Sequence, residues 1–349
     1  MRDQPTIVIG AGIAGLSAAI SLAARGREVL VLESDEAVGG KMRQLHPGGM
    51  PVDSGPTVLT LRSVFDELLA EAGLKLEDFD QPRPLDLLAR HAWDTCSRLD
   101  LFSDPQRSAD AIGELAGPAE ARGYLAFVED AARAYRTLEH SFLRAGRPNP
   151  VSLSWRARRH GPTALLGIRP FSSLWDSLGR HFRDPRLQQL FGRYATYCGS
   201  SPWLAPATLV VIAHVEREGV WQLGGGMQAL AGALQRAAQT LGAGFRLGTA
   251  VRHIDTRAGR VSGVTTREGE QLPCRDIVCT ADPGSLRAGL FGADAATALG
   301  PVPAGQQRSL SAITWSMLGV AEDFPLSTHN VFFSADYHRE FRQLFEAGQ

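Results

Sequence analysis

The chain is poor in cysteine, lacks metal-ligand motifs and carries almost no net charge, and each absence excludes a class of function. Its 349 residues include four cysteines and no CxxC pair, so we expect no disulfide framework and a reducing, cytoplasmic location. The nine histidines show no HExxH or other paired-ligand spacing, and we predict no metal. A net charge of −1 gives no indication of nucleic-acid binding, and no nucleic-acid partner is predicted.

Long hydrophobic runs are also scarce. Residues 6–24 form an uncharged stretch of 19 residues, which is long enough to be considered as a membrane span. Its glycines and many alanines make it a poor span, and Arg2 is followed directly by Asp3, so the basic start of a secretory signal is missing. We interpret the stretch as a buried strand followed by a helix.

Three glycines within this stretch predict a dinucleotide site. A β-branched run precedes Gly10, Gly12 and Gly15, which have GxGxxG spacing, and a helix-like stretch follows them. In such a motif the first glycine permits the turn, the second lets a pyrophosphate approach the backbone, and the third lets the helix pack closely. Glu33 lies 18 residues beyond Gly15, at the end of a second apolar run, where a carboxylate can bind ribose hydroxyls. Together these features predict an adenine dinucleotide.

A second glycine turn, Gly39-Gly40-Lys41, follows Glu33 and favours a flavin over a nicotinamide cofactor. A nicotinamide dehydrogenase would be expected to continue with another strand, helix and strand. A second turn with its own backbone donors suits a longer ligand, whereas a plain β-turn is the simpler alternative.

The remaining patterns predict an α/β protein with a discontinuous dinucleotide domain. We expect a Rossmann-like domain over residues 1–84 and 215–288, and an inserted α+β substrate domain over residues 85–214 and 289–349. We expect helices over residues 64–72 (capped by Ser63), 119–143 and 228–241, and two short helices within 171–190. We expect short strands within residues 85–102 and further strands over 245–256, 260–267 and 275–280.

Residues 7–57 resemble the N-terminal region of flavin amine oxidase-like proteins. More narrowly, they resemble the bacterial carotenoid (phytoene) desaturases, in which Asp-x-Gly-Pro-Thr follows the glycine doublet, here Asp53-Ser-Gly-Pro-Thr57. The likeness continues through Arg193-Tyr-Ala-Thr-Tyr-Cys-Gly-Ser-Ser-Pro202, Gly224-Gly-Gly-Met227 and Thr280-Ala-Asp-Pro283. The run over residues 194–202, together with Gly-Gly-Met, most resembles the 1-hydroxycarotenoid 3,4-desaturases, also called methoxyneurosporene dehydrogenases.

The resemblance implies a glutathione reductase-like fold, a non-covalent FAD and the removal of two hydrogens from a carotenoid C–C bond. For this subgroup the product has a 3,4 double bond on an acyclic hydroxycarotenoid such as hydroxyneurosporene or rhodopin. Phytoene desaturation and another flavin amine oxidase-like reaction, on an amine or a porphyrinogen, are the alternatives. Neither the motifs nor the resemblance identifies the electron acceptor.

The same resemblance predicts the residues that bind FAD. They lie in the glycine turns, at the end of the second strand and in a strand that follows Gly224-Gly-Gly-Met227, where the backbone of Val251 would touch the adenine end. The predicted set is Gly10, Gly12, Ala14, Gly15, Glu33, Gly39, Gly40, Lys41, Gly55, Pro56, Thr57 and Val251.

Asp130 and Arg133 are the candidates for acid or base catalysis. They are three residues apart on the expected long helix and therefore share a face. In the carotenoid desaturase family, which this chain resembles, an Asp-x-x-Arg pair on the corresponding helix is a proposed acid/base element. A solvent-exposed ion pair is the simpler interpretation.

Residues 147–193 are strongly basic. They contain nine arginines and two aspartates, a local charge of +7, interleaved with aromatic residues and leucines. This composition predicts a basic amphipathic segment that docks on anionic lipid, and hence a peripheral location on the cytoplasmic membrane. A basic solvated face over a buried apolar stripe is the alternative.

The carotenoid desaturases that this chain resembles are longer than this chain. They carry a glycine-rich segment near the C-terminus that covers the flavin ring, and no such segment precedes Gln349. We therefore expect a fragment of a longer enzyme, or a truncated, inactive flavoprotein that keeps only the adenosine half of its site.

Overall fold

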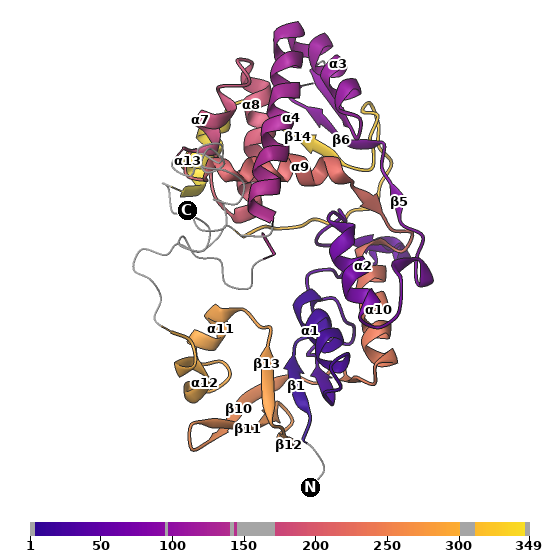
Figure 1. Ribbon diagram of the computed structural model, residues 1–349, viewed down its shortest axis with the longest axis vertical. Helices are drawn as coiled ribbons and strands as arrows, with labels where there is room; N and C mark the ends of the chain where they lie inside the picture. The colour runs from indigo at the N-terminus through magenta and orange to yellow at the C-terminus, as the bar shows by residue number, and fades with distance from the viewer. Residues whose placement is uncertain (1–3, 95–96, 140–142, 145–171, 301–310, 346–349) are drawn as a thin grey trace. The chain divides into compact units, whose positions relative to one another are not determined.

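The computed structural model describes residues 4–94, 97–139, 143–144, 172–300 and 311–345, which belong to two compact units (Figure 1). Unit 1 comprises Met1–Arg83, Trp221–Gln306 and Ile313–Gly319, and unit 2 comprises Pro84–Val220, Gln307–Ala312 and Val320–Gln349. The predicted placement of residues 289–306 in the substrate domain is wrong. These residues belong to unit 1, where helix α12 (Ala293–Thr297) contacts strand β10 (Val251–Arg257).

A parallel sheet lies at the centre of unit 1. Its strands are β13 (Asp276–Cys279), β1 (Thr6–Ile9), β2 (Val29–Leu32) and β9 (Gly244–Arg246), in that order. The strands are short, β-branched runs, as expected for a sheet that is buried on both faces. The strands predicted at residues 6–9 and 29–32 are confirmed.

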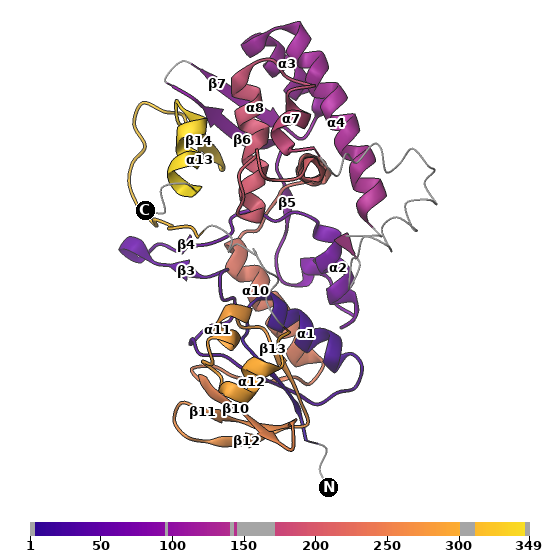
Figure 2. The ribbon, with the colours of Figure 1, turned by 90° about the vertical axis from the view of Figure 1, so that its left-hand side faces the viewer.

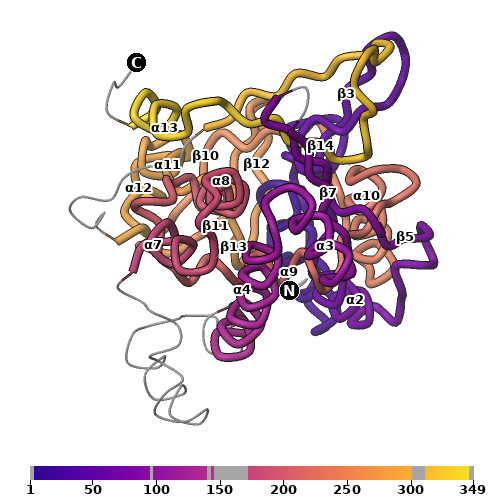
Figure 3. The backbone as a smooth tube through the Cα atoms, turned by 90° about the horizontal axis from the view of Figure 1, so that it is seen from above, coloured from indigo at the N-terminus to yellow at the C-terminus, as the bar shows by residue number. Residues whose placement is uncertain are grey.

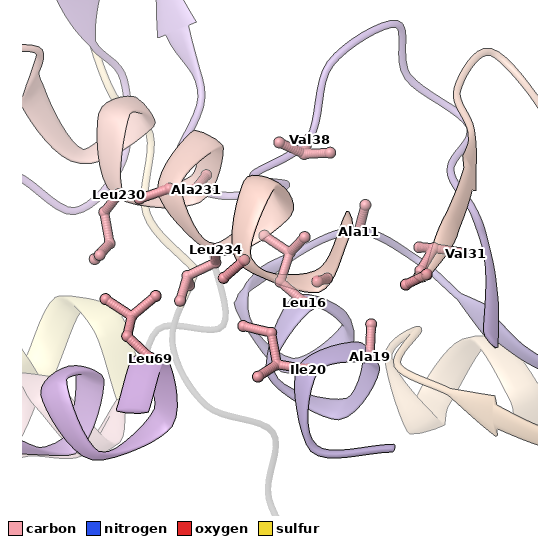
Figure 4. Close-up of a cluster of buried hydrophobic side chains, with 14 of the residues drawn as sticks. Ala11, Leu16, Ala19, Ile20, Val31, Val38, Leu69, Leu230, Ala231 and Leu234 are labelled. Atoms are coloured by element: carbon pink, nitrogen blue, oxygen red, sulfur yellow. The ribbon is translucent and has the colours of Figure 1, made fainter. Parts of the chain in front are cut away.

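Side chains alternate between the two faces of this sheet. Val8 and Val31 pack on one face with helices α1 (Ile13–Ala23) and α10 (Gly226–Thr240). Figure 4 shows Leu16 and Ile20 of α1 pointing toward Leu234 of α10, with Leu69 of α2 (Arg62–Ala70) beside them. Ile7, Ile9 and Leu32 pack on the opposite face. This period of two is the geometry of an extended strand.

A small antiparallel sheet covers the second face of the parallel sheet. It consists of β10, β11 (Arg260–Thr266) and β12 (Gln271–Pro273), and Figure 2 shows its three strands. The prediction of one strand over residues 245–256 is wrong, because β9 and β10 belong to different sheets. Gly248 has a φ of +62° and donates its N–H to the Asp35 carbonyl, so the chain turns between the two strands. Unit 1 also contains a two-stranded antiparallel ribbon, formed by β3 (Gln44–Leu45) and β4 (Val52–Asp53).

Unit 2 is a mixed sheet packed with helices. Strand β6 (Leu87–Ala92) pairs antiparallel with β7 (Arg98–Phe102) and parallel with β14 (Asn330–Phe332). The α-helices in the described part of unit 2 are α3 (Pro105–Ala116), α4 (Pro118–Leu138), α7 (Leu174–Leu178), α8 (Pro185–Gly192), α9 (Val211–Glu218) and α13 (Tyr337–Phe345). Helices α3 and α4 lie side by side (Figure 3). The core contains Phe127, Phe182 and Phe191, whose ring centroids are 4.8 to 5.4 Å apart.

Local signals explain where the sequence analysis missed or displaced helices. Helix α3 was not predicted, although Asp104 accepts a hydrogen bond from the Gln106 N–H at 2.7 Å, in a standard N-cap followed by proline. Helix α9 was also not predicted. The predicted cap at Ser63 is wrong: α2 begins at Arg62, after Leu61 in a left-handed conformation with φ of 49°.

The basic segment is described only in part. Residues 145–171, which carry five of its nine arginines, lie outside the described residues. Within the described part, Leu174, Leu178 and Phe182 have no exposed surface and belong to the core of unit 2. Their burial agrees with the alternative of a buried apolar stripe beneath a basic face, and the lipid contact of the segment stays a prediction. Among the described helices none is both long and apolar enough to span a membrane.

Candidate functional site

Three loops of unit 1 meet at the carboxyl end of the parallel sheet. The Gly39 N–H donates to the Ala11 carbonyl at 2.8 Å, and Gly12 and Gly39 form an isolated parallel bridge. A Cβ on Gly40 would lie 3.3 Å from the Gly12 Cα. A Cβ on Gly55 would lie 1.8 Å from the Lys41 carbonyl oxygen. The structure thus brings the predicted loops around residues 12, 40 and 55 into backbone contact, which requires glycine at positions 40 and 55.

Gly10 and Gly15 are required by packing. Gly10 has a φ of +100°, and a Cβ there would lie 2.7 Å from the Thr280 hydroxyl. A Cβ on Gly15 would lie 1.9 Å from the Gly10 carbonyl oxygen. Thr280 donates its hydroxyl to the Ile9 carbonyl at 2.9 Å, which fixes this neighbour of the glycine turn. Thr280 belongs to a motif that carries the family resemblance, and it was not among the predicted cofactor residues.

Gly12 differs from these glycines. Its backbone is extended, with φ of −70° and ψ of 178°, and nothing lies within 4 Å of the position of a Cβ. Gly12 is the N-cap of α1, no side chain caps this helix, and Ile13 and Ala14 in its first turn are exposed. The first N–H groups of α1 and its positive dipole end are therefore open to an anion. These features fit the pyrophosphate of a dinucleotide.

Glu33 ends strand β2 and its side chain is buried beside the glycine turn. Its Oε2 accepts the Ala11 N–H at 2.6 Å, and its Oε1 accepts the Asp35 N–H at 3.0 Å. The Ser34 hydroxyl also donates to Oε1 at 2.9 Å, so the acceptor capacity that remains for a ribose hydroxyl is on Oε2. The Thr249 N–H donates to the Glu33 carbonyl at 2.6 Å, which places the start of β10, and with it Val251, along the same edge.

Lys41, Pro56 and Thr57 are exposed residues on the same loops. Lys41 contributes a carbonyl to the close contact with Gly55, and its side chain lies at the surface. The whole predicted cofactor set therefore belongs to unit 1, although the structure alone assigns no role to these three side chains.

Two aspartates hold the N-terminus of α10. Asp53 accepts the Met227 N–H at 2.8 Å, and Asp80 accepts the N–H groups of Gly224 and Gly225 at 3.0 and 3.1 Å. Burial by itself would raise the pKa of Asp80, but the hydrogen bonds from Gly225 and Gly224 outweigh it and lower the pKa. Protein carboxylates thus occupy the Gly224-Gly-Gly-Met227 turn, in contrast to the uncapped start of α1.

Asp130 and Arg133 form an ion pair on α4 of unit 2. The second oxygen of Asp130 lies 3.2 Å from the Nε2 of His181, a partner that the sequence analysis missed. Arg133 is mostly exposed, whereas His181 is largely buried. The structure therefore places Asp130 between a surface cation and a shielded imidazole, and its catalytic role stays a prediction. Among the described residues no group of histidine, cysteine and acidic side chains could hold a metal ion.

The parallel sheet, the glycine loops and the acidic strand end define a dinucleotide-binding α/β protein. Residues 13–321 match the family of flavin-containing amine oxidoreductases. The chain belongs to this family and to its carotenoid desaturases. FAD is its cofactor, and the residues described above fit the adenosine and pyrophosphate groups of FAD.

The sequence relatives are carotenoid enzymes. The chain is 47% identical to hydroxyneurosporene desaturase of Rubrivivax gelatinosus, over 100% of this chain and 66% of the relative. It is 43% identical to hydroxyneurosporene desaturase of Cereibacter sphaeroides, over 98% of this chain and 69% of the relative. The chain thus spans about two thirds of the length of these relatives.

Solved structures agree on the fold. An oxidoreductase from Methanosarcina mazei superposes with a TM-score of 0.56 at 16% identity, covering 81% of this chain and 60% of the other. At this identity the likeness concerns the fold alone.

Proposed function

We propose that the protein containing this chain is an FAD-dependent desaturase that introduces a 3,4 double bond into a 1-hydroxylated acyclic carotenoid. The observation that carries the proposal is the 41–47% identity, over nearly the whole chain, to three hydroxyneurosporene desaturases. The glycine loops of unit 1 support it, because they supply a dinucleotide site of the kind that such an enzyme needs.

The residues of unit 1 hold the cofactor. The start of α1 and Gly12 bind the pyrophosphate, and Glu33 binds the ribose of the adenosine. When bound, FAD supplies an acceptor for the hydride that leaves the substrate carbon. The protein contributes orientation of the polyene and the removal of one proton from the neighbouring carbon.

Asp130 is our candidate for the group that receives this proton. Its carboxylate is held between Arg133 and His181, so its orientation is set from two sides. Replacing Asp130 by asparagine keeps the shape and removes the base. We expect turnover to fall at unchanged flavin content, and unchanged turnover would leave Asp130 as a structural ion pair.

We further propose a peripheral contact with the cytoplasmic membrane. A carotenoid is almost insoluble in water, so its enzyme must collect it from a bilayer. The basic, aromatic composition of residues 147–171 supports a contact with anionic lipid. Flotation of the protein with liposomes that contain or lack anionic lipid tests this contact, and absence of lipid association would contradict it.

The desaturation is tested with the full-length protein and a 1-hydroxylated acyclic carotenoid in liposomes. A new conjugated double bond shifts the absorption of the polyene to longer wavelength, and we expect this shift only in preparations that retain flavin. Release of peroxide from amines without a carotenoid product would favour an amine oxidase instead. A purified protein without a flavin spectrum would favour the inactive alternative.

A further inference from the structure

Three side chains of unit 2 converge on the carboxylate of Glu216 in helix α9. Arg193 approaches it to 3.1 Å, the Tyr194 hydroxyl donates to it at 2.6 Å, and the Tyr197 hydroxyl donates to it at 3.3 Å. The side chains of Arg193 and Glu216 are only 18% and 15% exposed. Burial, followed by the charge of Glu216, raises the pKa of Tyr194, so its hydroxyl stays a donor. Tyr194 and Tyr197 come from the run that most resembles hydroxycarotenoid desaturases, and Arg193 directly precedes it.

Several buried polar atoms in the described part of unit 2 have no hydrogen-bond partner in the protein. Within the described part of unit 2 they include the Nε of Arg193, the Nε2 of His91, the Nε1 of Trp203 and the hydroxyl of Tyr337. Folded proteins leave few such atoms unpaired, because losing hydrogen bonds to water without replacement is costly. Each of these atoms therefore indicates a polar group, outside the described residues' own side chains and backbone, that completes its hydrogen bonding.

Pairwise observations link the four side chains, since the charge of Arg193 acts on the pKa of both His91 and Tyr337. A Cβ on Gly192 would lie 3.5 Å from the Tyr337 hydroxyl, and the ring centroids of Trp203 and Tyr337 are 5.6 Å apart. Burial and, to a smaller extent, the positive charge of Arg193 together lower the pKa of His91 to about 3. His91 is therefore neutral at pH 7. The term Arg193 cluster is used below for Arg193, Glu216, His91, Trp203 and Tyr337.

The unpartnered atoms of the Arg193 cluster include both hydrogen-bond donors and a hydrogen-bond acceptor. Arginine and tryptophan nitrogens can only donate, and a tyrosine hydroxyl can donate or accept. The Nδ1 of His91 lies 3.3 Å from the Leu99 carbonyl, to which only a protonated nitrogen can donate, so the Nε2 of the neutral ring is an acceptor. A group that both accepts and donates is needed to satisfy such a set. An alcohol hydroxyl has this capacity and carries no charge, whereas a carboxylate would face Glu216.

We propose that the Arg193 cluster binds the tertiary hydroxyl at the end of the carotenoid substrate. This inference rests on the proposed function and identifies the part of unit 2 that recognises the hydroxylated end. The hydroxyl is on C1, two bonds from C3, so holding it fixes the position of the C3–C4 bond along an otherwise uniform polyene. A bound water has the same hydrogen-bonding chemistry, and the substrates below distinguish the two sources.

The experiment compares two substrates in three variants of the full-length protein. The substrates are a 1-hydroxylated acyclic carotenoid and the same polyene without the hydroxyl, and the readout is the ratio of their kcat/KM values. The test variants are Tyr337→Phe and Trp203→Phe, which remove an unpartnered polar atom and keep an aromatic ring. Tyr124→Phe is the matched control, because Tyr124 is a buried tyrosine of unit 2 whose hydroxyl bonds to Ser108.

We expect the wild type to favour the hydroxylated substrate by at least about 10-fold, since sites built to bind a substrate hydroxyl reject analogues that lack it. Tyr337→Phe and Trp203→Phe each lower this ratio about 10-fold, because the loss falls mainly on kcat/KM for the hydroxylated substrate. The control lowers the Tm and keeps the ratio. Weaker retention of the hydroxylated carotenoid by purified Tyr337→Phe, measured by absorbance, provides a readout independent of turnover.

Each other outcome is decisive. An unchanged ratio in both test variants, with normal flavin content, means that the cluster holds only water, and the inference is wrong. A wild type that desaturates both substrates equally also overturns it while keeping the proposed desaturase function. A wild type that binds flavin and desaturates neither substrate refutes the proposed function itself.

Discussion

A single methyl group placed on Gly12 or on Gly15 should separate cofactor binding from folding. In Gly12→Ala the new Cβ meets nothing within 4 Å, and the backbone, with φ of −70°, accepts any residue. Gly-to-Ala changes at compatible positions stabilise proteins by about 0.4–1 kcal/mol through the unfolded state. We therefore expect the flavin-free protein to keep or slightly raise its free energy of unfolding.

The same methyl should interfere with the pyrophosphate, because it projects where the ligand approaches the helix start. Overpacking costs about 1–3 kcal/mol, which corresponds to a Kd for FAD that is about 5- to 150-fold weaker. In Gly15→Ala the Cβ would lie 1.9 Å from the Gly10 carbonyl oxygen, so strand and helix must separate. This variant should lose stability by more than 3 kcal/mol or fail to fold.

The assay combines thermal unfolding of the flavin-free protein with titration of FAD by flavin fluorescence. We expect flavin-free Gly12→Ala to have an unchanged or higher Tm and to bind FAD more weakly than the wild type. Binding of FAD as tight as that of the wild type would show that the pyrophosphate does not pass Gly12. A large loss of stability in Gly12→Ala would show that the open space beside this glycine is filled.

Three further predictions concern stability. The pKa of Asp80 is lower in the folded than in the unfolded chain, so ionised Asp80 stabilises the fold above about pH 4. This stabilisation is lost as the pH falls through the pKa that Asp80 has in the folded state. Asp80→Asn should therefore flatten the pH dependence of urea unfolding in this range. The pKa of His91 falls from 6.5 to about 3 on folding, so the unfolded state binds more protons between these values, and stability should drop by up to about 1.4 kcal/mol per pH unit below pH 6.5. A His91→Phe variant that retains this slope would contradict the assignment. Phe127 has no exposed surface and contacts three aromatic rings, so Phe127→Ala should cost about 3–5 kcal/mol in urea unfolding, and a loss below 1 kcal/mol would mean that the core of unit 2 collapses around the gap.

Much of the cofactor site could be predicted because its signals are local. Gly10, Gly12 and Gly15 lie within one strand, turn and helix, where spacing and the absence of a Cβ decide the geometry. The place of Glu33 follows from the next strand, which the short connecting helix forces to pair in parallel with the first. These residues were predicted without knowledge of any other part of the chain.

Contacts between distant residues could not be predicted in this way. Asp80 meets Gly224 across 144 positions, and Thr280 meets Gly10 across 270 positions. No local pattern distinguishes Asp80 from other surface aspartates, because its role depends on which helix end packs beside it. The same reason explains Leu174: an amphipathic pattern shows that a face is apolar, and only packing decides whether protein or lipid covers it.

Short-range chemistry in the sequence therefore specified the class of ligand, since a turn without Cβ atoms and an acid at a strand end suffice to receive a dinucleotide. Folding decided which side chains meet around it. It placed carboxylates on the start of α10 and left the start of α1 uncapped, and it assembled Arg193, Tyr194 and Glu216 from two separate helices. The physical reason is that backbone conformation depends on neighbours in the chain, whereas hydrogen-bond partners and burial depend on neighbours in space.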